Sequence, residues 1–289
     1  MAGVTAAPTA QPRADVPAPQ DVDELEDLLA GGGVVVLSGA GLSTDSGIPD
    51  YRGATGSLRR HTPMTYQTFT GDADARRRYW ARSHLGWRTI ARAAPNGGHR
   101  AVSDLERRGV LAGIVTQNVD GLHQAGGARS VIELHGNLAR VVCLGCGDRT
   151  DREALDARLR AANPTFDARA LAINPDGDVE LSDAAVAAFA MVDCVACGGL
   201  LKPDVVFFGE TVPPDRVRDA YSLVDRARAL LVLGSSLMVM SGRRFVVRAV
   251  KLGLPVAIVN VGTTREDGRA TLTVNAPLGT VLPELCRSL

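Results

Sequence analysis

The chain has little lysine, no net charge and no long hydrophobic run. Lys202 and Lys251 are its only lysines, so 30 of its 32 basic residues are arginine. Together with abundant alanine, this bias indicates a GC-rich genome rather than a binding surface. Acidic and basic residues balance at 32 each, which gives no indication of a nucleic-acid or membrane partner. No apolar run approaches the roughly 20 residues that a membrane span requires.

The N-terminal stretch lacks the features of a secretory signal. Residues 1–20 are rich in Ala, Pro and Thr and contain neither a charged segment nor an apolar core. We expect them to form a disordered tail. Without an export signal, and with cysteines expected to be reduced, the sequence predicts a cytoplasmic protein. Cys286 stands apart from the other four cysteines, and we interpret it as a small packing residue.

Four of the five cysteines form two Cys-x-x-Cys pairs: Cys143 with Cys146, and Cys194 with Cys197. A two-residue gap lets both sulfurs of a pair reach one Zn²⁺ at about 2.3 Å. Gly147 and Gly198 follow the two pairs and permit the tight turns that this requires. Because four protein ligands leave no open position for water, we expect one structural zinc per chain. A redox dithiol and disulfides are the alternatives.

Short apolar runs alternate with helical patterns along most of the chain. The runs suit strands buried on both faces of a parallel sheet. They are residues 34–37, 111–115, 131–134, 205–208, 230–233 and 256–259. Amphipathic helices are predicted at residues 21–29, 74–92, 99–108 and 244–252. This alternation predicts a Rossmann-like, doubly wound α/β fold.

The cysteine block interrupts this alternation. Residues 141–201 have their own predicted helix, 151–162, and a turn at Asn174-Pro175-Asp176-Gly177. We expect a small inserted zinc-binding domain there, and a helical excursion from the sheet at about residues 56–95. The Rossmann-like domain then comprises residues 21–140 and 202–289.

Gly39 and Gly41 follow the first predicted strand and indicate a dinucleotide site. Glycines in such a turn let backbone N–H groups approach a pyrophosphate at a helix N-terminus. Thr44 stands where the third glycine of the dehydrogenase fingerprint is expected. Arg59-Arg60-His61 occupies the region where an acidic residue should end a second strand. The turn therefore favours a nucleotide site but not a hydride-transferring dehydrogenase.

Further motifs accompany this turn in a fixed order. They are Gly39-Ala40-Gly41-Leu42-Ser43, Gly47-Ile48-Pro49-Asp50-Tyr51-Arg52, Thr116-Gln117-Asn118-Val119-Asp120-Gly121-Leu122-His123, Glu133-Leu134-His135-Gly136, the two cysteine pairs, Phe207-Phe208-Gly209-Glu210, Gly234-Ser235-Ser236 and Val259-Asn260. From about Val34 to Pro283 the sequence resembles the sirtuin family of SIR2-like NAD-dependent protein deacylases. The long gap between the cysteine pairs and the Pro-Asp-Tyr-Arg form are more similar to the class II-like bacterial branch than to the desuccinylases.

The resemblance implies an NAD-dependent protein-lysine deacylase, in the first place a deacetylase, whose partners are acyl-lysine proteins or peptides. In its reaction the acyl-lysine attacks the anomeric carbon of NAD⁺, nicotinamide leaves, and the acyl group passes to ADP-ribose. Residues 54–70 lack the spacing of the acyl-discriminating Tyr and Arg of desuccinylases, which favours an acetyl or a longer apolar chain. A mono-ADP-ribosyltransferase and a non-enzymatic NAD-sensing zinc protein are the alternatives.

Catalysis is expected from His135, Asn118 and Asp120. His135 follows a predicted strand, at the edge where α/β sheets bind ligands, and an unperturbed pKa of about 6.5 suits a general base. The resemblance implies that it deprotonates a ribose hydroxyl after nicotinamide leaves. Asn118 and Asp120 follow another strand and have groups that hydrogen-bond ribose hydroxyls or a carboxamide. Capping of the next helix is the alternative role of Asp120.

The remaining contacts are also implied by the resemblance. Tyr51 would shield the reacting ribose from water on a mobile loop, and Arg52 would pair with the pyrophosphate. The cofactor site would comprise Gly39, Ala40, Gly41, Ser43, Asp50, Tyr51, Arg52, Gln117, Asn118, Val119, Asp120, Gly234, Ser235, Ser236, Asn260, Val261, Gly262 and Leu278. The substrate peptide would pair with a strand edge formed by Val206, Phe207, Gly209 and Glu210. Because neighbours on a strand alternate in direction, either Phe207 or Phe208 is expected in the core.

Overall fold

A computed structural model describes residues 19–53, 63–166 and 181–289 of the chain. Most of the expected tail, the turn at residues 174–177 and the segment at residues 59–61 lie outside the described residues. Pro19 and Gln20, expected at the end of the tail, begin the first helix, α1 (Pro19–Ala30). Within the described ranges, no helix is both long enough and apolar enough to cross a membrane.

Six parallel strands form the large sheet, in the order β3-β2-β1-β7-β8-β9. They are β1 (Val34–Ser38), β2 (Leu111–Thr116), β3 (Val131–Glu133), β7 (Ala229–Leu233), β8 (Val256–Val259) and β9 (Leu272–Val274). The chain adds β2 and β3 on one side of β1 and places β7, β8 and β9 on the other, so the order reverses between β1 and β7. Open α/β sheets bind ligands beyond the carboxyl ends of their strands at such a point.

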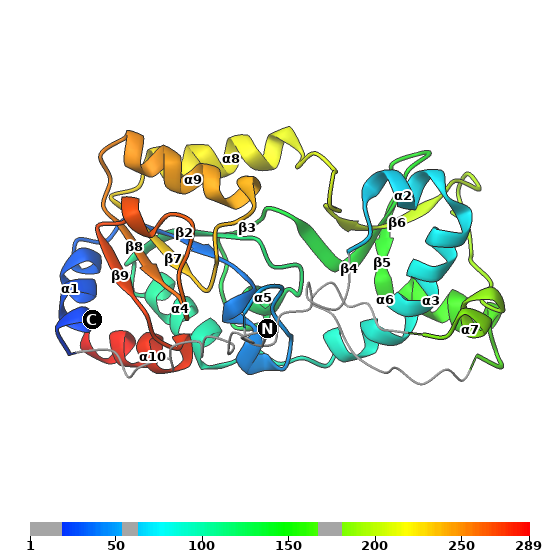
Figure 1. Cartoon of the computed structure of the whole chain (residues 1–289), viewed down its shortest axis with the longest axis horizontal. Helices are drawn as coiled ribbons and strands as arrows, with labels where there is room; N and C mark the ends of the chain where they lie inside the picture. The colour runs from blue at the N-terminus through cyan, green and yellow to red at the C-terminus, as the bar shows by residue number, and fades with distance from the viewer. Residues whose placement is uncertain (1–18, 54–62, 167–180) are drawn as a thin grey trace, which may run out of the picture.

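Both faces of this sheet are covered by helices (Figure 1). Val34 and Val36 of β1 face a core shared with α1, α4 (Gly97–Arg107) and α10 (Leu278–Ser288). Val35 and Leu37 face the opposite core, beneath α8 (Pro214–Asp225) and α9 (Met240–Lys251). Burial on both faces explains why the strand is apolar at successive positions.

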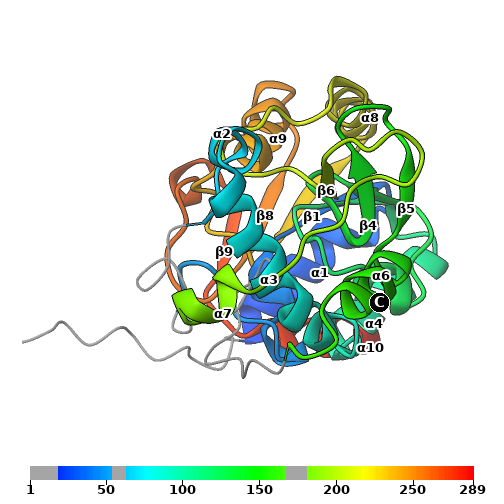
Figure 2. The same ribbon diagram turned by 90° about the vertical axis from the view of Figure 1, so that its right-hand side faces the viewer.

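A second sheet and its helices form a smaller unit, which faces the viewer in Figure 2. Its strands are antiparallel in the order β5-β4-β6: β4 (Gly136–Cys143), β5 (Arg149–Asp151) and β6 (Leu201–Val205). Its helices are α2 (Tyr66–Gly71), α3 (Ala73–Ile90), α6 (Arg152–Ala162) and α7 (Asp183–Ala187). One core joins these helices to β4 and β6. The helical excursion and the cysteine block therefore pack together as one unit.

Arg152 is central to this packing, and its side chain is almost fully buried. Its guanidinium lies 5.4 Å from the ring centre of Trp80 and 5.6 Å from that of Trp87, both on α3. It also donates to the Ser83 carbonyl at 3.2 Å. Cation–π contacts of this kind are favourable when the cation is desolvated, so Arg152 links the start of α6 to α3.

The parallel strand predicted at residues 205–208 is wrong. Val205 instead ends β6 in the small antiparallel sheet. The N–H of Val206 donates to the His135 carbonyl, and that of Phe207 donates to the Glu210 carboxylate, so these donors are not available for a parallel ladder. The sequence pattern also misses β9, a strand of only three residues.

Candidate active site

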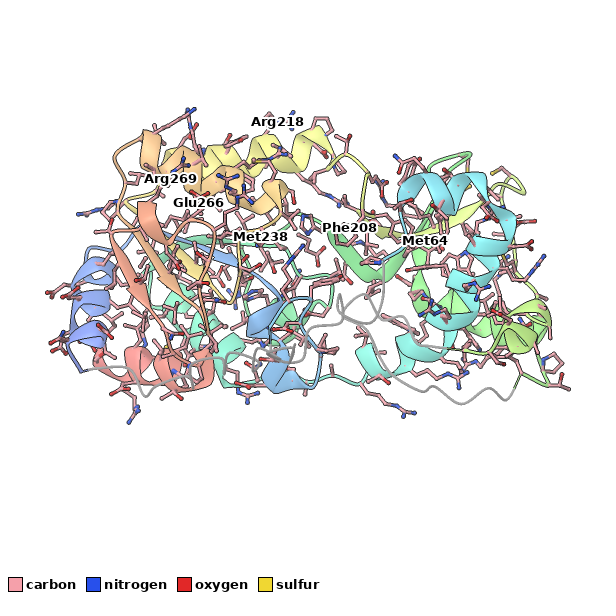
Figure 3. The ribbon with its side chains drawn as sticks, in the orientation of Figure 1. Met64, Phe208, Arg218, Met238, Glu266 and Arg269 are labelled. Atoms are coloured by element: carbon pink, nitrogen blue, oxygen red, sulfur yellow. The ribbon has the colours of Figure 1, made fainter. Side chains whose placement is uncertain are left out.

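A cavity of about 820 Å³ opens between the carboxyl edge of the large sheet and the small unit. Loops after β1, β2, β7 and β8 form one side, and the chain after β6 forms the other. All residues predicted to act in catalysis or to bind cofactor or substrate line it, except Leu278. In Figure 3 three lining residues, Met238, Phe208 and Met64, follow one another from the large sheet toward the small unit.

Leu278 is the exception among the predicted cofactor residues. It is the first residue of α10, is almost fully buried, and packs in the core that α10 shares with α1 and α4. It does not belong to the wall of the cavity that the described residues form.

The glycine turn after β1 packs backbone to backbone against the loop after β7. The N–H of Gly41 donates to the Gly234 carbonyl at 2.9 Å. A Cβ at Gly39 would lie 2.8 Å from that carbonyl oxygen, and a Cβ at Gly41 would lie 2.9 Å from it. Only residues without a side chain fit this approach. Two short 3₁₀ turns, Ala40–Leu42 and Thr44–Ser46, follow in place of the long helix of a dehydrogenase site.

Asn118, Ser43 and Asp120 line the cavity and form a connected hydrogen-bond network. The amide nitrogen of Asn118 donates to the Gly39 carbonyl at 3.0 Å and to Ser43 Oγ at 3.1 Å. Ser43 Oγ in turn donates to Asp120 Oδ2 at 2.7 Å. Because the Asn118 nitrogen is used in this way, its amide oxygen is the group that it offers a ligand.

The position of Asp120 is compatible with both roles considered from the sequence, which are ligand binding and capping of the next helix. Its Oδ1 accepts the N–H of Leu122 at 2.9 Å, at the start of α5 (Leu122–Ala125), while the carboxylate also lines the cavity. Burial raises the pKa of this carboxyl, although the hydrogen bonds from Leu122 and Ser43 act to lower it.

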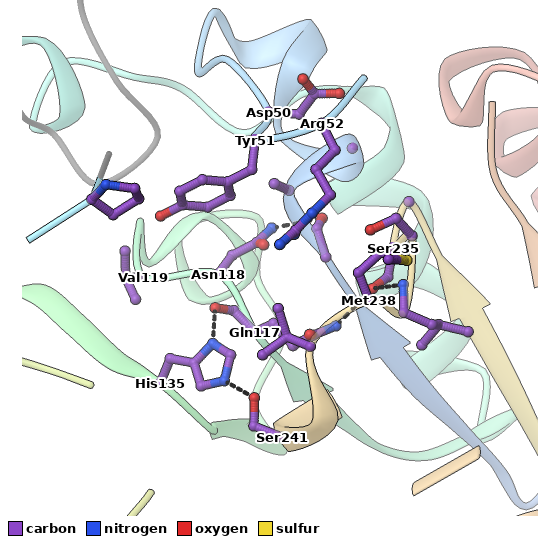
Figure 4. A pocket seen from close by; sticks show the side chains of 18 of the residues that line it. Asp50, Tyr51, Arg52, Gln117, Asn118, Val119, His135, Ser235, Met238 and Ser241 are labelled. Carbon is purple, nitrogen blue, oxygen red and sulfur yellow. Dashed lines mark hydrogen bonds between the residues drawn. The ribbon is translucent and has the colours of Figure 1, made fainter. Parts of the chain in front are cut away.

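His135 follows β3 and is held at both ring nitrogens (Figure 4). Nδ1 lies 3.0 Å from the Gln117 carbonyl oxygen, and Nε2 lies 2.8 Å from Ser241 Oγ. Since a carbonyl only accepts, Nδ1 carries the proton and Nε2 has the lone pair. Burial lowers the pKa of His135 to about 4, and the charges of Arg216 and Arg244 act in the same direction. The ring is therefore neutral at pH 7, and its Nε2 is a weaker base than the unperturbed pKa of about 6.5 predicts.

No sequence motif indicates Ser241. It lies 106 positions from His135 and outside every motif, as the second residue of α9. A serine near a helix start is a weak signal, since serines are common there for capping.

Gln117 lines the cavity, and its side chain lies between β1 and α9. Its side-chain nitrogen donates to Ser235 Oγ at 2.9 Å. Gly242 packs so closely against it that a Cβ would lie 2.3 Å from Gln117 Oε1. The side chain of Asn260, after β8, donates to the carbonyls of Val261 and Gly262, so the amide holds the last of the four loops.

Tyr51 and Phe208 approach each other across the cavity. Their ring centres are 6.2 Å apart in an edge-to-face arrangement, a favourable geometry for aromatic pairs. Phe208 is 39% exposed, whereas Phe207 is 7% exposed and packs against Phe69 and Tyr79 in the small-unit core. Phe207 is thus the core residue of the pair, although it also touches the cavity.

The predicted substrate segment, residues 206–210, is supported by a buried lysine. Lys202 on β6 donates to Glu210 Oε2 at 3.1 Å and to the carbonyls of Pro203 and Val205. Glu210 Oε2 also accepts the N–H of Phe207 at 2.8 Å. The Glu210 carboxylate therefore stabilises the turn of this segment by accepting from both Lys202 and the N–H of Phe207.

The four paired cysteines gather at one point, where β4 ends and the chain enters β6. Their sulfurs all lie within 4.8 Å of one another. Cys143 and Cys197 are 3.5 Å apart, and Cys146 and Cys194 are 3.9 Å apart. These separations exceed a disulfide of about 2.05 Å and are close to the roughly 3.8 Å of sulfurs around a tetrahedral Zn²⁺. At about 3.4 Å per residue, β4 separates Cys143 from His135 by roughly 20 Å or more.

The fold and the site define a Sir2-type protein, and comparison with known proteins agrees. The Sir2 family model matches residues 39–241, and the chain belongs to this family. It is 60% identical over 272 residues to NAD-dependent protein deacetylase 1 of Streptomyces coelicolor, covering 94% of this chain and 91% of that protein. It is 52% identical over 271 residues to NAD-dependent protein deacetylase 1 of Mycobacterium avium, covering 92% and 95%.

Solved structures of the family are also similar. A Sir2 structure with p53 peptide and NAD⁺ superposes with a TM-score of 0.73 at 31% identity, covering 92% of this chain and 96% of that one. A Sir2Tm structure bound to a propionylated peptide gives a TM-score of 0.72 at 30% identity, covering 92% and 98%.

Proposed function

We propose that this chain is an NAD-dependent protein-lysine deacetylase that transfers the acetyl group to ADP-ribose and releases nicotinamide. The observation that carries the proposal is a neutral His135, fixed at Nδ1, in the same cavity as the Asn118–Ser43–Asp120 network. The names of the curated relatives and the peptide and NAD⁺ complexes of the solved structures support it.

The residues of the cavity fit a dinucleotide. The packed glycines leave backbone surface in place of side chains at the turn, and Ser235, Ser236 and Asn260 follow two neighbouring strands. We assign the ribose hydroxyls to Asn118 and Asp120, and the pyrophosphate to the glycine turn with Arg52. NAD⁺ supplies the electrophilic ribose carbon and the hydroxyls that receive the acyl group.

The chain's own contribution to chemistry centres on His135. Its Nε2 accepts a proton from a ribose hydroxyl, while Nδ1–H stays bonded to the Gln117 carbonyl and stabilises the resulting imidazolium. Tyr51, paired with Phe208 across the opening, excludes water from the reacting ribose.

The peptide is assigned to residues 206–210 by strand addition, with the acyl-lysine entering beside Val206 and Phe207. An acetyl or longer apolar chain suits the aromatic and aliphatic side chains at this end of the cavity, among them Ile48 and Met64. The cysteine cluster is assigned one structural Zn²⁺, which supplies folding energy and no chemistry.

Mass spectrometry of an acetyl-lysine peptide incubated with NAD⁺ tests the proposal. We expect the peptide to lose its acetyl mass and O-acetyl-ADP-ribose to appear. A peptide that gains ADP-ribose would establish mono-ADP-ribosyl transfer instead. His135→Ala should retain NAD⁺ binding and lose turnover by a factor of about 10² or more. Binding without turnover in both proteins would favour an NAD sensor.

A further inference from the structure

We propose that Ser241 is a positioning residue for His135: its hydroxyl donates to Nε2 and holds the lone pair of the base in the cavity until a substrate hydroxyl takes that position. The proposal rests on the proposed function, because it concerns the same histidine. In the contact itself, Ser241 Oγ lies 2.8 Å from Nε2 (Figure 4).

The direction of this hydrogen bond follows from the other nitrogen. The Gln117 carbonyl accepts and cannot donate, so it accepts a hydrogen bond from Nδ1–H, and the proton stays on Nδ1. In the neutral ring Nε2 then has no proton and must accept. The Ser241 hydroxyl is therefore the donor, and the imidazole is fixed at both ends of one tautomer.

Burial is the main cause of the neutral state of His135, and two nearby positive charges add to it. Arg216 on α8 and Arg244 on α9 both disfavour the imidazolium. The Arg216 charge is partly offset by Asp204 of β6, whose Oδ1 lies 3.2 Å from its guanidinium. Asp120 lies across the same cavity, and its own charge is disfavoured by burial. The Ser241 hydroxyl consequently faces the lone pair of His135 Nε2 rather than an N–H group.

The position of Ser241 is set by the packing of α9. Phe245 and Val246, one turn further on, are fully buried in the core beneath that helix. Gly242, next to Ser241, packs against the side chain of Gln117, whose carbonyl holds Nδ1. The same contact between α9 and the loop after β2 thus fixes both partners of the imidazole.

This arrangement gives Ser241 a defined role in the proton transfer. A ribose hydroxyl that approaches Nε2 meets a base whose lone pair already points along the cavity. The O–H bond of that hydroxyl breaks, its proton forms the Nε2–H bond, and the electron pair stays on the ribose oxygen. The Nδ1–H group remains hydrogen-bonded to the Gln117 carbonyl. The Ser241 hydroxyl rotates away from Nε2 and takes up no proton itself.

Two variants separate the hydroxyl from the shape of the site. Ser241→Ala removes the donor, and Ser241→Thr keeps it. We expect Ser241→Ala to lower kcat for an acetyl-lysine peptide about tenfold, as loss of one hydrogen bond to a catalytic group predicts. Ser241→Thr should return kcat to within about threefold of the wild type. Ser222→Ala, on α8 and outside the cavity wall, is the matched control and should leave kcat unchanged.

Exchange of labelled nicotinamide into NAD⁺ separates a positioning role from a merely structural one. If Ser241 only stabilised the fold of the site, its loss would lower this exchange as well as turnover. This exchange reports the step before the proton transfer, so Ser241→Ala should keep it within about twofold while product formation falls. The proposal is overturned if exchange and turnover fall together, if Ser241→Ala turns over at the wild-type rate, or if Ser241→Thr fails to restore kcat.

A spectroscopic measurement keeps this inference separate from the proposed function. In ligand-free protein labelled with ¹⁵N-histidine, the Nε2 signal of His135 should shift in Ser241→Ala toward that of a nitrogen without a donor. An unchanged signal would contradict the proposal even if the enzyme deacetylates. If the wild type shows no deacetylation, the proposed function is wrong. The spectrum still shows whether the Ser241 hydroxyl donates to His135 Nε2.

Discussion

At the scale of single residues, burial keeps three histidines neutral. Burial lowers the pKa of His99 to about 4, that of His123 to about 3 and that of His135 to about 4. The rings of His99 and His123 meet edge to face at 5.3 Å, and His123 Nε2 lies 2.8 Å from Ser38 Oγ, directly before the glycine turn. Protonation of this pair would place charge beside the cofactor loop.

We expect the free energy of unfolding to fall between pH 7 and pH 5. In the unfolded chain histidine binds protons with a pKa near 6.5, whereas the folded values are far lower, so the unfolded state binds more protons in this window. Each such histidine should contribute a loss of about 2 kcal/mol. Urea unfolding at both pH values measures the loss.

A variant isolates one member of the group. His123→Asn should lose about 2 kcal/mol less than the wild type between the two pH values, because it no longer has that proton uptake. Equal losses in the two proteins would contradict a buried, neutral His123.

Residues that belong to short motifs can be located from the sequence. The glycines of the turn, the cysteine pairs and His135 each have neighbours that indicate their position, and the structure brings them where those motifs suggest. Ser241 and the lowered pKa of His135 cannot be predicted in this way. Ser241 comes from α9, and the pKa is lowered by burial together with charges on α8 and α9, which are distant in sequence. Leu278 belongs to none of these motifs, and apolar packing of α10 decides the position of its side chain.

At the scale of secondary-structure elements, the substrate segment depends on β6. Lys202 is almost fully buried, and its ammonium group lies 4.8 Å from the ring centre of Phe207. Its bond to Glu210 couples the strand to the turn at residues 206–210. A buried ion pair of this kind stabilises one geometry of the segment more than it stabilises the fold.

Lys202→Met should therefore affect both stability and peptide binding. Removing the ammonium leaves the Glu210 carboxylate without its cation, at a cost of about 3 kcal/mol in the free energy of unfolding. We expect the KM for the peptide to rise more than the KM for NAD⁺, since we assign this segment to the peptide. Thermal unfolding and steady-state kinetics measure the two effects.

The double variant Lys202→Met/Glu210→Gln supplies the control. It removes both charges and should recover part of the stability lost in Lys202→Met, as expected for a coupled pair. Additive losses would show that the two side chains act independently.

Strands are predictable from sequence where both faces are buried by local helices. The apolar runs of β1, β7 and β8 predict these strands almost to the residue. The run at residues 205–208 has the same composition, but its hydrogen-bond partners come from His135 and Glu210 rather than from a parallel neighbour. No local pattern distinguishes these two outcomes.

At the scale of the whole molecule, the cavity lies between a large parallel domain and a smaller unit joined by several chain crossings (Figure 1). The cysteine cluster connects the far ends of β4 and β6, whose other ends reach His135 and the substrate segment. Removal of the Zn²⁺ that we propose for this cluster should therefore disturb one wall of the cavity through the sheet.

Both tryptophans of the chain, Trp80 and Trp87, lie on α3 in the small unit. We expect chelation of zinc to change their fluorescence and lower the unfolding temperature of that unit, because structural zinc contributes folding energy. Fluorescence follows the small unit, and far-UV circular dichroism follows the whole chain.

Two cysteine variants complete this test. Cys146→Ser should lose zinc, measured by elemental analysis, and reproduce the effect of chelation. Cys286→Ser, whose thiol contacts Ala101 in the large domain, should retain about one zinc per chain. A zinc-free protein with unchanged fluorescence and unfolding temperature would exclude a structural metal.

The scarcity of lysine has a consequence for a protein that acts on acylated lysine. Lys202 is sealed within the small unit by Glu210, Pro203 and Val205, and Lys251 at the end of α9 is exposed. In the folded state, reactive acyl donors can therefore modify a single lysine side chain per molecule. The enzyme is almost inert toward the modification that it removes, so its activity need not decline as acylation accumulates around it.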